Sequence, residues 1–77
     1  MAHEALVIKE EREYVKEAIE RLAPESREAI VLRQYHSLSY QEISEILGCS
    51  LEKVKVLIFR AREQLRVDLK SLIKEGE

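Results

Sequence analysis

Apolar residues recur every three or four positions in four separate stretches of the chain, which is the spacing of amphipathic helices. No stretch alternates apolar and polar residues as a half-buried strand would. We expect helices over residues 8–22, 24–35, 40–47 and 51–73. Their predicted core residues are Val15, Ala18, Ile19 and Leu22; Ala29, Ile30, Leu32 and Tyr35; Ile43, Ile46 and Leu47; and Val54, Leu57, Ile58, Ala61 and Leu65. The prediction is a small all-α domain of four helices, without winged elements.

The third and fourth helices carry the local signals of a helix-turn-helix. Ser39 and Glu42 have the spacing of a capping box, in which each side chain bonds the backbone N–H of the other residue. Gly48 stands where the chain needs a positive φ, and Ser50 can cap the next helix. Ser44 is small, as required where the two helices cross. The pattern therefore predicts that the helix from residue 51 is a recognition helix whose early exposed residues face the DNA major groove. The alternative is an ordinary helical hairpin in a bundle.

Length and composition limit the chain to one domain with one modest core. It has 77 residues, of which 45% are hydrophobic and only 5% aromatic, so an aromatic stacking platform for single-stranded nucleic acid is not expected. The sequence has no apolar run of about 18 residues and no signal-peptide pattern, so we expect a cytoplasmic protein without a membrane partner. Residues 1–7 are expected to be disordered or derived from an expression vector, and residues 75–77 to be frayed.

The formal net charge of −2 is unusual for a DNA-binding protein, but the charge is unevenly distributed along the chain. Residues 1–52 hold 11 acidic and 6 basic residues, a net charge of −5, whereas residues 53–77 hold 7 basic and 4 acidic residues, a net charge of +3. The basic residues of the second part are Lys53, Lys55, Arg60, Arg62, Arg66, Lys70 and Lys74. They lie on the predicted recognition helix, with Lys74 directly after its expected end, as expected of a nucleic-acid-binding surface.

No constellation of residues indicates catalysis or a bound cofactor. His3, His36 and Cys49 lack the spacing of metal ligands, and one cysteine excludes an intramolecular disulfide. Cys49 is best explained as a small buried residue in the turn. Glu42 and Glu45 fit helix capping and a solvated face. The sequence therefore predicts a protein that is not an enzyme, with no catalytic residue, cofactor, metal or small-molecule substrate.

Several segments in the same order resemble region 4 of bacterial sigma factors. They are Leu22-Ala23-Pro24-Glu25-Ser26-Arg27-Glu28, Leu32-Arg33, Leu38-Ser39-Tyr40-Gln41-Glu42-Ile43, Ile46-Leu47-Gly48-Cys49-Ser50, Val54-Lys55 and Arg60-Ala61-Arg62. The resemblance covers residues 14–70 and is greatest to the extracytoplasmic-function group.

The resemblance implies a four-helix domain that binds double-stranded promoter DNA at the −35 element during transcription initiation. It also implies contact with RNA polymerase core through the β-subunit flap, and control by an anti-sigma factor. Region 2 of these proteins has no counterpart in the 77 residues. We therefore expect either a fragment or an isolated domain, which could not open a promoter alone.

The chain departs from the family pattern at the start of the recognition helix. Glu52-Lys53 stands where Gly-Thr is common, and Val56-Leu57 stands where Ser-Arg is common. Two apolar residues thus replace a small polar residue and a phosphate-binding arginine. These replacements bear on base preference and predict weaker phosphate contact.

Position on the recognition helix and residue type assign the expected DNA contacts. Arginine and lysine can donate to guanine, glutamate can accept from cytosine N4, and apolar side chains can touch a thymine methyl. The residues expected to contact base edges are Glu52, Lys55, Val56, Phe59 and Arg60. The residues expected to contact phosphates, near helix N-termini or beside the reading face, are Ser39, Tyr40, Gln41, Ser50, Lys53, Arg62 and Arg33.

Two other functions remain open from the sequence. One is a response-regulator-type helix-turn-helix output domain, which would bind a two-fold symmetric site. The other is a helical protein-interaction module in which an apolar Val56-Leu57 patch binds a partner helix. Failure to bind duplex DNA at low salt would favour the interaction module.

Overall fold

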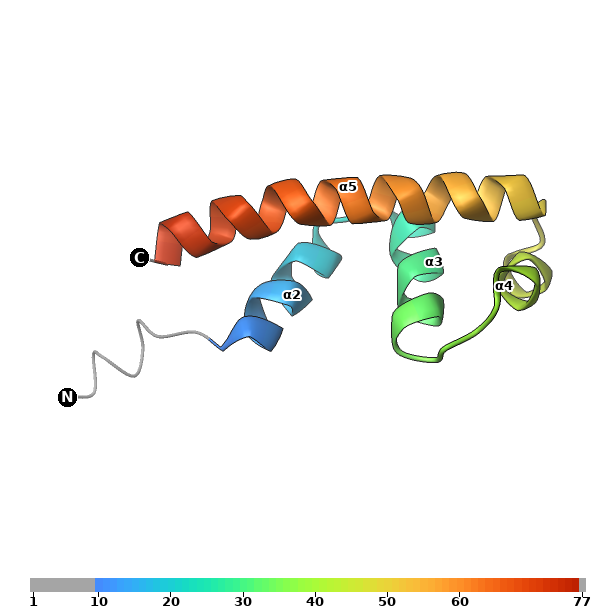
Figure 1. The fold of residues 1–77 in the computed structure, drawn as a ribbon, viewed down its shortest axis with the longest axis horizontal. Helices are drawn as coiled ribbons and strands as arrows, with labels where there is room; N and C mark the ends of the chain where they lie inside the picture. The colour runs from blue at the N-terminus through green and yellow to red at the C-terminus, as the bar shows by residue number, and fades with distance from the viewer. Residues whose placement is uncertain (1–9, 77) are drawn as a thin grey trace.

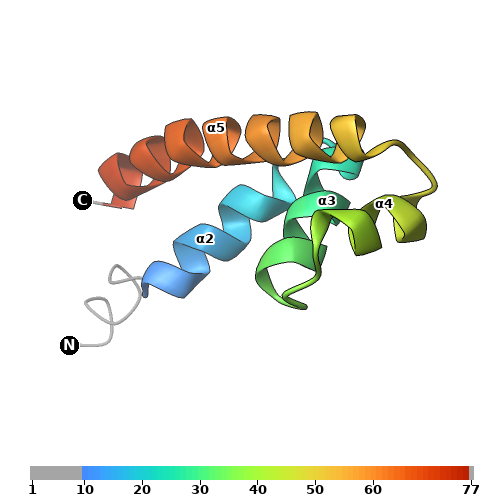
Figure 2. The same cartoon turned by 45° about the vertical axis from the view of Figure 1, so that its right-hand side comes forward.

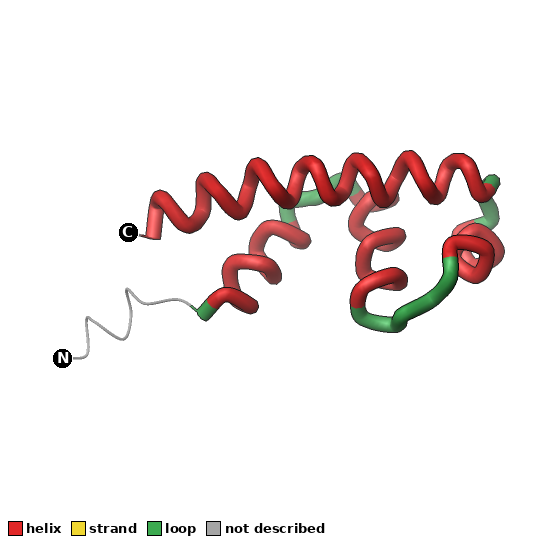
Figure 3. The backbone as a smooth tube through the Cα atoms, in the orientation of Figure 1, coloured by secondary structure: helices red, strands yellow, loops and turns green. Residues whose placement is uncertain are grey.

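The computed structural model describes residues 10–76, and these form four helices joined by short loops. The helices are α2 (Glu11–Glu20), α3 (Pro24–Gln34), α4 (Tyr40–Leu47) and α5 (Leu51–Gly76). Figure 3 shows that the described part of the chain contains helices and loops but no strand. The predicted all-α class is therefore confirmed.

Helix α5 is the axis on which the other helices are arranged. It has 26 residues, and α2, α3 and α4 all lie on one side of it (Figure 1). Helix α2 runs under the C-terminal half of α5, whereas α3 and α4 lie under its N-terminal half, as the turned view in Figure 2 also shows. One side of α5 is thus used for packing along its length, and the other side is left to solvent.

The core is formed where α3 and α4 meet the first three turns of α5. Its buried members are Leu22, Ala29, Ile30, Ile43, Val54, Leu57, Ile58 and Ala61. The predicted apolar stripe of α5 is confirmed, because Val54, Leu57, Ile58 and Ala61 are all buried. Leu65, its last member, is partly buried against the same cluster. Ala18 of α2 and Leu72 of α5 are also buried, but outside this cluster.

Two predicted core residues are exposed. Tyr35 is 62% exposed because it follows the last residue of α3 and lies about half a turn away from Ser26, on the side opposite the buried residues of that helix. Ile46 is 59% exposed, and the small Ser44 is buried in its place. Helix α4 therefore packs through Ile43, Ser44 and Leu47, since a small side chain lets it cross close to its neighbour.

The ends of the helices partly match the expected ranges. Pro24 is the first residue of α3, as predicted, and Tyr35 is its C-cap. Helix α5 continues to Gly76, beyond the expected end at residue 73 and into the segment expected to fray. No proline or glycine stands between residue 51 and Gly76 to stop it. The expected helix start at Ile8 and the expectations for residues 1–7 and 77 lie outside the described residues.

Candidate nucleic-acid interface

The turn between α4 and α5 has the geometry that its sequence predicts. The Ser39 hydroxyl accepts from the Glu42 N–H at 3.1 Å, and the Glu42 carboxylate accepts from the Ser39 N–H at 2.9 Å. Gly48 has φ 66° and ψ 38°, the left-handed conformation that glycine adopts most easily. The Ser50 hydroxyl accepts from the Lys53 N–H at 3.1 Å and so caps α5. The turn holds α4 and α5 as a helix-turn-helix.

The capping box also affects the titration of Glu42. Hydrogen bonds from the backbone and then from the side chain of Ser39 hold the pKa of the Glu42 carboxyl below its ordinary value of 4.5. The charged form of Glu42 is the one that accepts both bonds, so it is favoured in the folded chain. The N-terminal end of α4 is thus stabilised by a carboxylate near its positive pole.

The solvent side of α5 presents an apolar pair between two carboxylates, and we call these four residues the outer face. At about 100° per residue, Glu52, Val56, Phe59 and Glu63 all project away from the buried stripe. Val56 is 44% exposed and Phe59 is 66% exposed. Three of the five predicted base-reading residues, Glu52, Val56 and Phe59, therefore lie together on the outer face.

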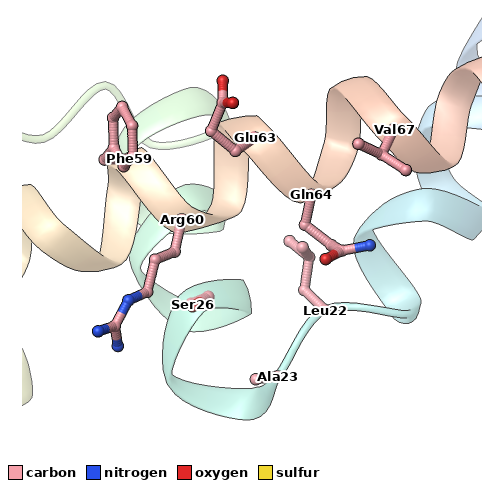
Figure 4. A pocket seen from close by; sticks show the side chains of 8 residues that line it. All are labelled: Leu22, Ala23, Ser26, Phe59, Arg60, Glu63, Gln64 and Val67. Atoms are coloured by element: carbon pink, nitrogen blue, oxygen red, sulfur yellow. The ribbon is translucent and has the colours of Figure 1, made fainter.

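Basic residues occupy both flanks of the outer face. Lys55 and Arg62, seven residues apart, lie on one flank, and Lys53 and Arg60 have the same spacing on the other. Figure 4 shows Arg60 extending from α5 toward Ser26 at the start of α3, whereas Phe59 points away from α3. All four basic residues are exposed. Lys55 and Arg60, the remaining predicted base-reading residues, are therefore on the flanks.

Lys53 is paired within the chain. Its Nζ lies 3.4 Å from the Glu25 Oε2 of α3, and both side chains are at least half exposed. Glu25 and Glu28 line a cavity of about 240 Å³ with Cys49, Lys53 and other residues of the turn. The predicted phosphate contact of Lys53 must therefore compete with a carboxylate of its own chain.

Arg33 holds the loop that leads into α4. Its Nη1 donates to the Leu38 carbonyl at 2.8 Å, and its guanidinium lies 5.0 Å from the centre of the Tyr40 ring. Arg33 and Tyr40 are both half-buried. These contacts position the N-terminal end of α4, and they give Arg33 a structural role beside the predicted phosphate contact.

A polar groove of about 450 Å³ is lined by Arg33 and Arg62 from two helices, and also by Gln34 and Ser37. Ser37 has φ 53°, an uncommon conformation for a residue other than glycine. The two arginines were expected from the sequence to contact phosphates, whereas Gln34 and Ser37 were not. The sequence indicated the positive φ of Ser37 only by placing a serine in the short connection between α3 and α4.

The other predicted phosphate contacts are exposed helix-start residues with local partners. Ser39 and Ser50 both act as caps, and Gln41 lies 3.4 Å from the Glu45 carboxylate as a hydrogen-bond donor. Cys49 is only half-buried in the turn, which corrects its expected burial. The cysteine packs against the core from one side and borders the Glu25 cavity from the other.

A known protein family matches most of the residues that form these helices. The profile of the family described as Sigma-70, region 4 matches residues 12–65, well over half of the chain. The chain belongs to the sigma-70 region 4 family. Region 4 domains of this family are helical helix-turn-helix domains, as the described residues are.

Two relatives show the extent of the similarity. The ECF RNA polymerase sigma-E factor of Escherichia coli (strain K12) is 42% identical over 72 residues, which cover 92% of this chain and 38% of that protein. The RNA polymerase sigma-H factor of Pseudomonas aeruginosa is 36% identical over 62 residues, 80% of this chain and 32% of that protein. The chain therefore spans less than two fifths of the length of the relatives it matches.

One departure from the region 4 pattern proves to be part of the core. Leu57 stands where the family commonly has arginine, and it is only 3% exposed. The predicted Val56-Leu57 surface patch is therefore wrong, because Val56 faces solvent while Leu57 packs against the core cluster. The two neighbours lie about 100° apart around the helix, so they cannot share one surface.

Within residues 10–76, no group of three or more His, Cys, Asp or Glu side chains is arranged to hold a metal ion. In the same part of the chain, no helix combines the length and the apolar character needed to cross a membrane.

Proposed function

We propose that this chain binds the −35 element of promoter DNA as region 4 of an RNA polymerase sigma factor, in the cytoplasm and without enzymatic activity. The outer face of α5 and its two basic flanks are the observation that carries the proposal. Family membership supports it independently.

The dimensions of α5 fit this role. A helix with its side chains is about 10–12 Å across, and the major groove is about 12 Å wide. With the outer face toward the base edges, Lys55 and Arg62 approach one phosphate backbone while Lys53 and Arg60 approach the other. The N-terminal end of α4, capped by Ser39, then meets a phosphate with its free backbone N–H groups.

Titration of a −35-like duplex with the full chain at two salt concentrations tests DNA binding. Because each phosphate contact releases a counterion, the affinity should fall steeply with salt. The affinity of the chain alone should be no better than about micromolar, near the non-specific range. A flat response to salt, or no binding at low salt, would reject the proposal.

We further propose that RNA polymerase core contacts the chain through the flap of its β subunit. An apolar groove of about 260 Å³ between α3 and α4 supports this, lined by Val31, Leu32, Leu47 and the exposed Ile46. The groove lies outside the reading surface of α5, so both contacts can form at once. An anti-sigma factor would compete for either surface.

Co-purification with core polymerase tests the second contact. Ile46→Asp should reduce retention of polymerase but leave duplex binding unchanged, because Ile46 is exposed and takes no part in the outer face. Glu45→Ala, an exposed change on the neighbouring position of α4, is the control. Retention that is equal for both variants would place the polymerase contact elsewhere.

A further inference from the structure

Val56 and Phe59 form a continuous apolar surface in the middle of an otherwise charged face. They are three residues apart on α5, so their side chains are neighbours on the helix surface. Glu52 precedes them and Glu63 follows them on the outer face, and basic residues lie on both flanks. Such exposed apolar side chains in a charged setting indicate a partner with apolar groups at its centre and negative charge at its edges.

The major groove of DNA has this distribution. The phosphates form its two walls, and the methyl group at C5 of thymine is the apolar feature of its floor. The carboxylate of Glu52 disfavours the approach of a phosphate to the outer face, whereas the carboxylate of Glu63 is paired with Arg66 at 3.1 Å. The apolar pair is therefore left to meet base edges.

We infer that this chain identifies thymine through its 5-methyl group, and that Val56 is the residue that determines this specificity. The inference rests on the proposed function and deepens it. Val56 lies in the second turn of α5, among the N-terminal residues of a recognition helix that reach base edges. Phe59 lies one turn further and covers the same apolar surface from the other side.

The test replaces single methyl groups in the DNA. A duplex is selected from a random pool with the full chain, and each thymine in turn is replaced by deoxyuridine, which lacks only the methyl group. Affinity should fall about fourfold at one or two positions, the effect of burying one methyl-sized group. In Val56→Ser the loss of affinity should disappear at the thymine that Val56 contacts, because the thymine methyl then has no apolar side chain to meet.

Two further variants make the result specific. Val56→Thr keeps a methyl group on the side chain and should retain most of the sensitivity to deoxyuridine. Val67→Ser is the matched control, because Val67 is 52% exposed and lies three turns further along α5 on the same side. It should leave the sensitivity unchanged. Serine and valine have similar helix propensities, and circular dichroism checks that each variant is folded.

Each outcome decides the inference. Loss of the deoxyuridine effect in Val56→Ser alone supports it. Equal sensitivity in the original chain and Val56→Ser, or no sensitivity at any thymine, overturns it while leaving the proposed DNA binding intact. Failure to enrich or bind any duplex at low salt overturns the proposed function, and the inference with it.

Discussion

The two halves of α5 are held in place by different means. The N-terminal half packs against α3 and α4 in the main core cluster. Ser39 and Gly48 cap the two ends of α4, and Ser50 caps the start of α5. The C-terminal half packs against α2, whose N-cap residue Glu10 makes no capping hydrogen bond with its side chain. The surface proposed to bind DNA is therefore built on the more tightly held half, as precise positioning of base contacts requires.

The largest expected difference between the halves comes from truncating one buried residue in each. Ile58→Ala should lower the free energy of unfolding by about 2–5 kcal/mol, because Ile58 is enclosed in the core cluster and its cavity cannot collapse. Leu72→Ala should cost less, since Leu72 lies outside the core cluster, on the half of α5 that packs against α2. Urea unfolding of both variants measures the difference. A larger loss for Leu72→Ala would reverse the comparison.

The turn at Gly48 should be the next most sensitive point. Gly48→Val should destabilise the fold by about 1–2 kcal/mol, because a branched side chain disfavours a positive φ. A Cβ at this position would meet no atom within 4 Å, so crowding contributes nothing. Gly48→Asn is the control, since asparagine tolerates this conformation. Equal melting temperatures for the two variants would show that backbone conformation is not the cause.

Removal of the cap on α4 should have a somewhat smaller effect. Ser39→Ala should cost about 0.5–2 kcal/mol of stability, because the Glu42 N–H loses its acceptor. Thermal unfolding measures it, and Lys70→Ala, a change at an exposed position on the C-terminal half of α5, is the comparison. A loss of stability for Lys70→Ala as large as that for Ser39→Ala would contradict a stabilising role for the cap.

The same capping box predicts how stability depends on pH. Because the pKa of Glu42 is lowered in the folded chain, its contribution is present above the ordinary value of 4.5 and is lost as pH falls through the lowered pKa. Glu42→Gln can still bond the Ser39 N–H but cannot titrate. The variant should therefore lose less stability than the original chain between neutral and acidic pH. Parallel pH profiles would contradict this account.

The smallest expected effect concerns the Lys53–Glu25 pair. Glu25→Gln should raise the affinity for duplex DNA by up to about fivefold, because exposed ion pairs contribute about 0–1 kcal/mol and Lys53 would be released. Glu11→Gln removes the same charge from the first turn of α2 and is the matched control. If both variants raise the affinity equally, the gain reflects net charge rather than the pair.

The sequence predicted the elements whose causes are local. The capping box, the positive φ of Gly48 and the Ser50 cap involve residues within a few positions of each other, so residue type and spacing were sufficient. Tyr35 and Ile46 were misplaced because a short helix has apolar residues on more than one side. Which side is buried depends on neighbours that meet only after folding.

The candidate site was predictable in position but not in its internal pairing. Residue type and helical phase were enough to find the exposed Val56 and Phe59, whereas Lys55 and Arg60 were expected on the reading face and lie on its flanks. The Glu25 partner of Lys53 is 28 residues away, and Arg33 reaches Leu38 and Tyr40 only because the loop folds back. Such contacts have no periodicity, so spacing alone does not reveal them.

Because α5 is one unbroken helix, the position of its C-terminal half is coupled to that of the surface proposed to read DNA. At 1.5 Å per residue, its 26 residues span about 39 Å, and the helix contains no proline or internal glycine at which it could bend. A tilt of about 5° imposed at the α2 end would move the other end by roughly 3 Å, as much as the length of a hydrogen bond. Any change in the angle at which α2 packs on α5 would therefore reach the surface proposed to bind DNA through one continuous helix.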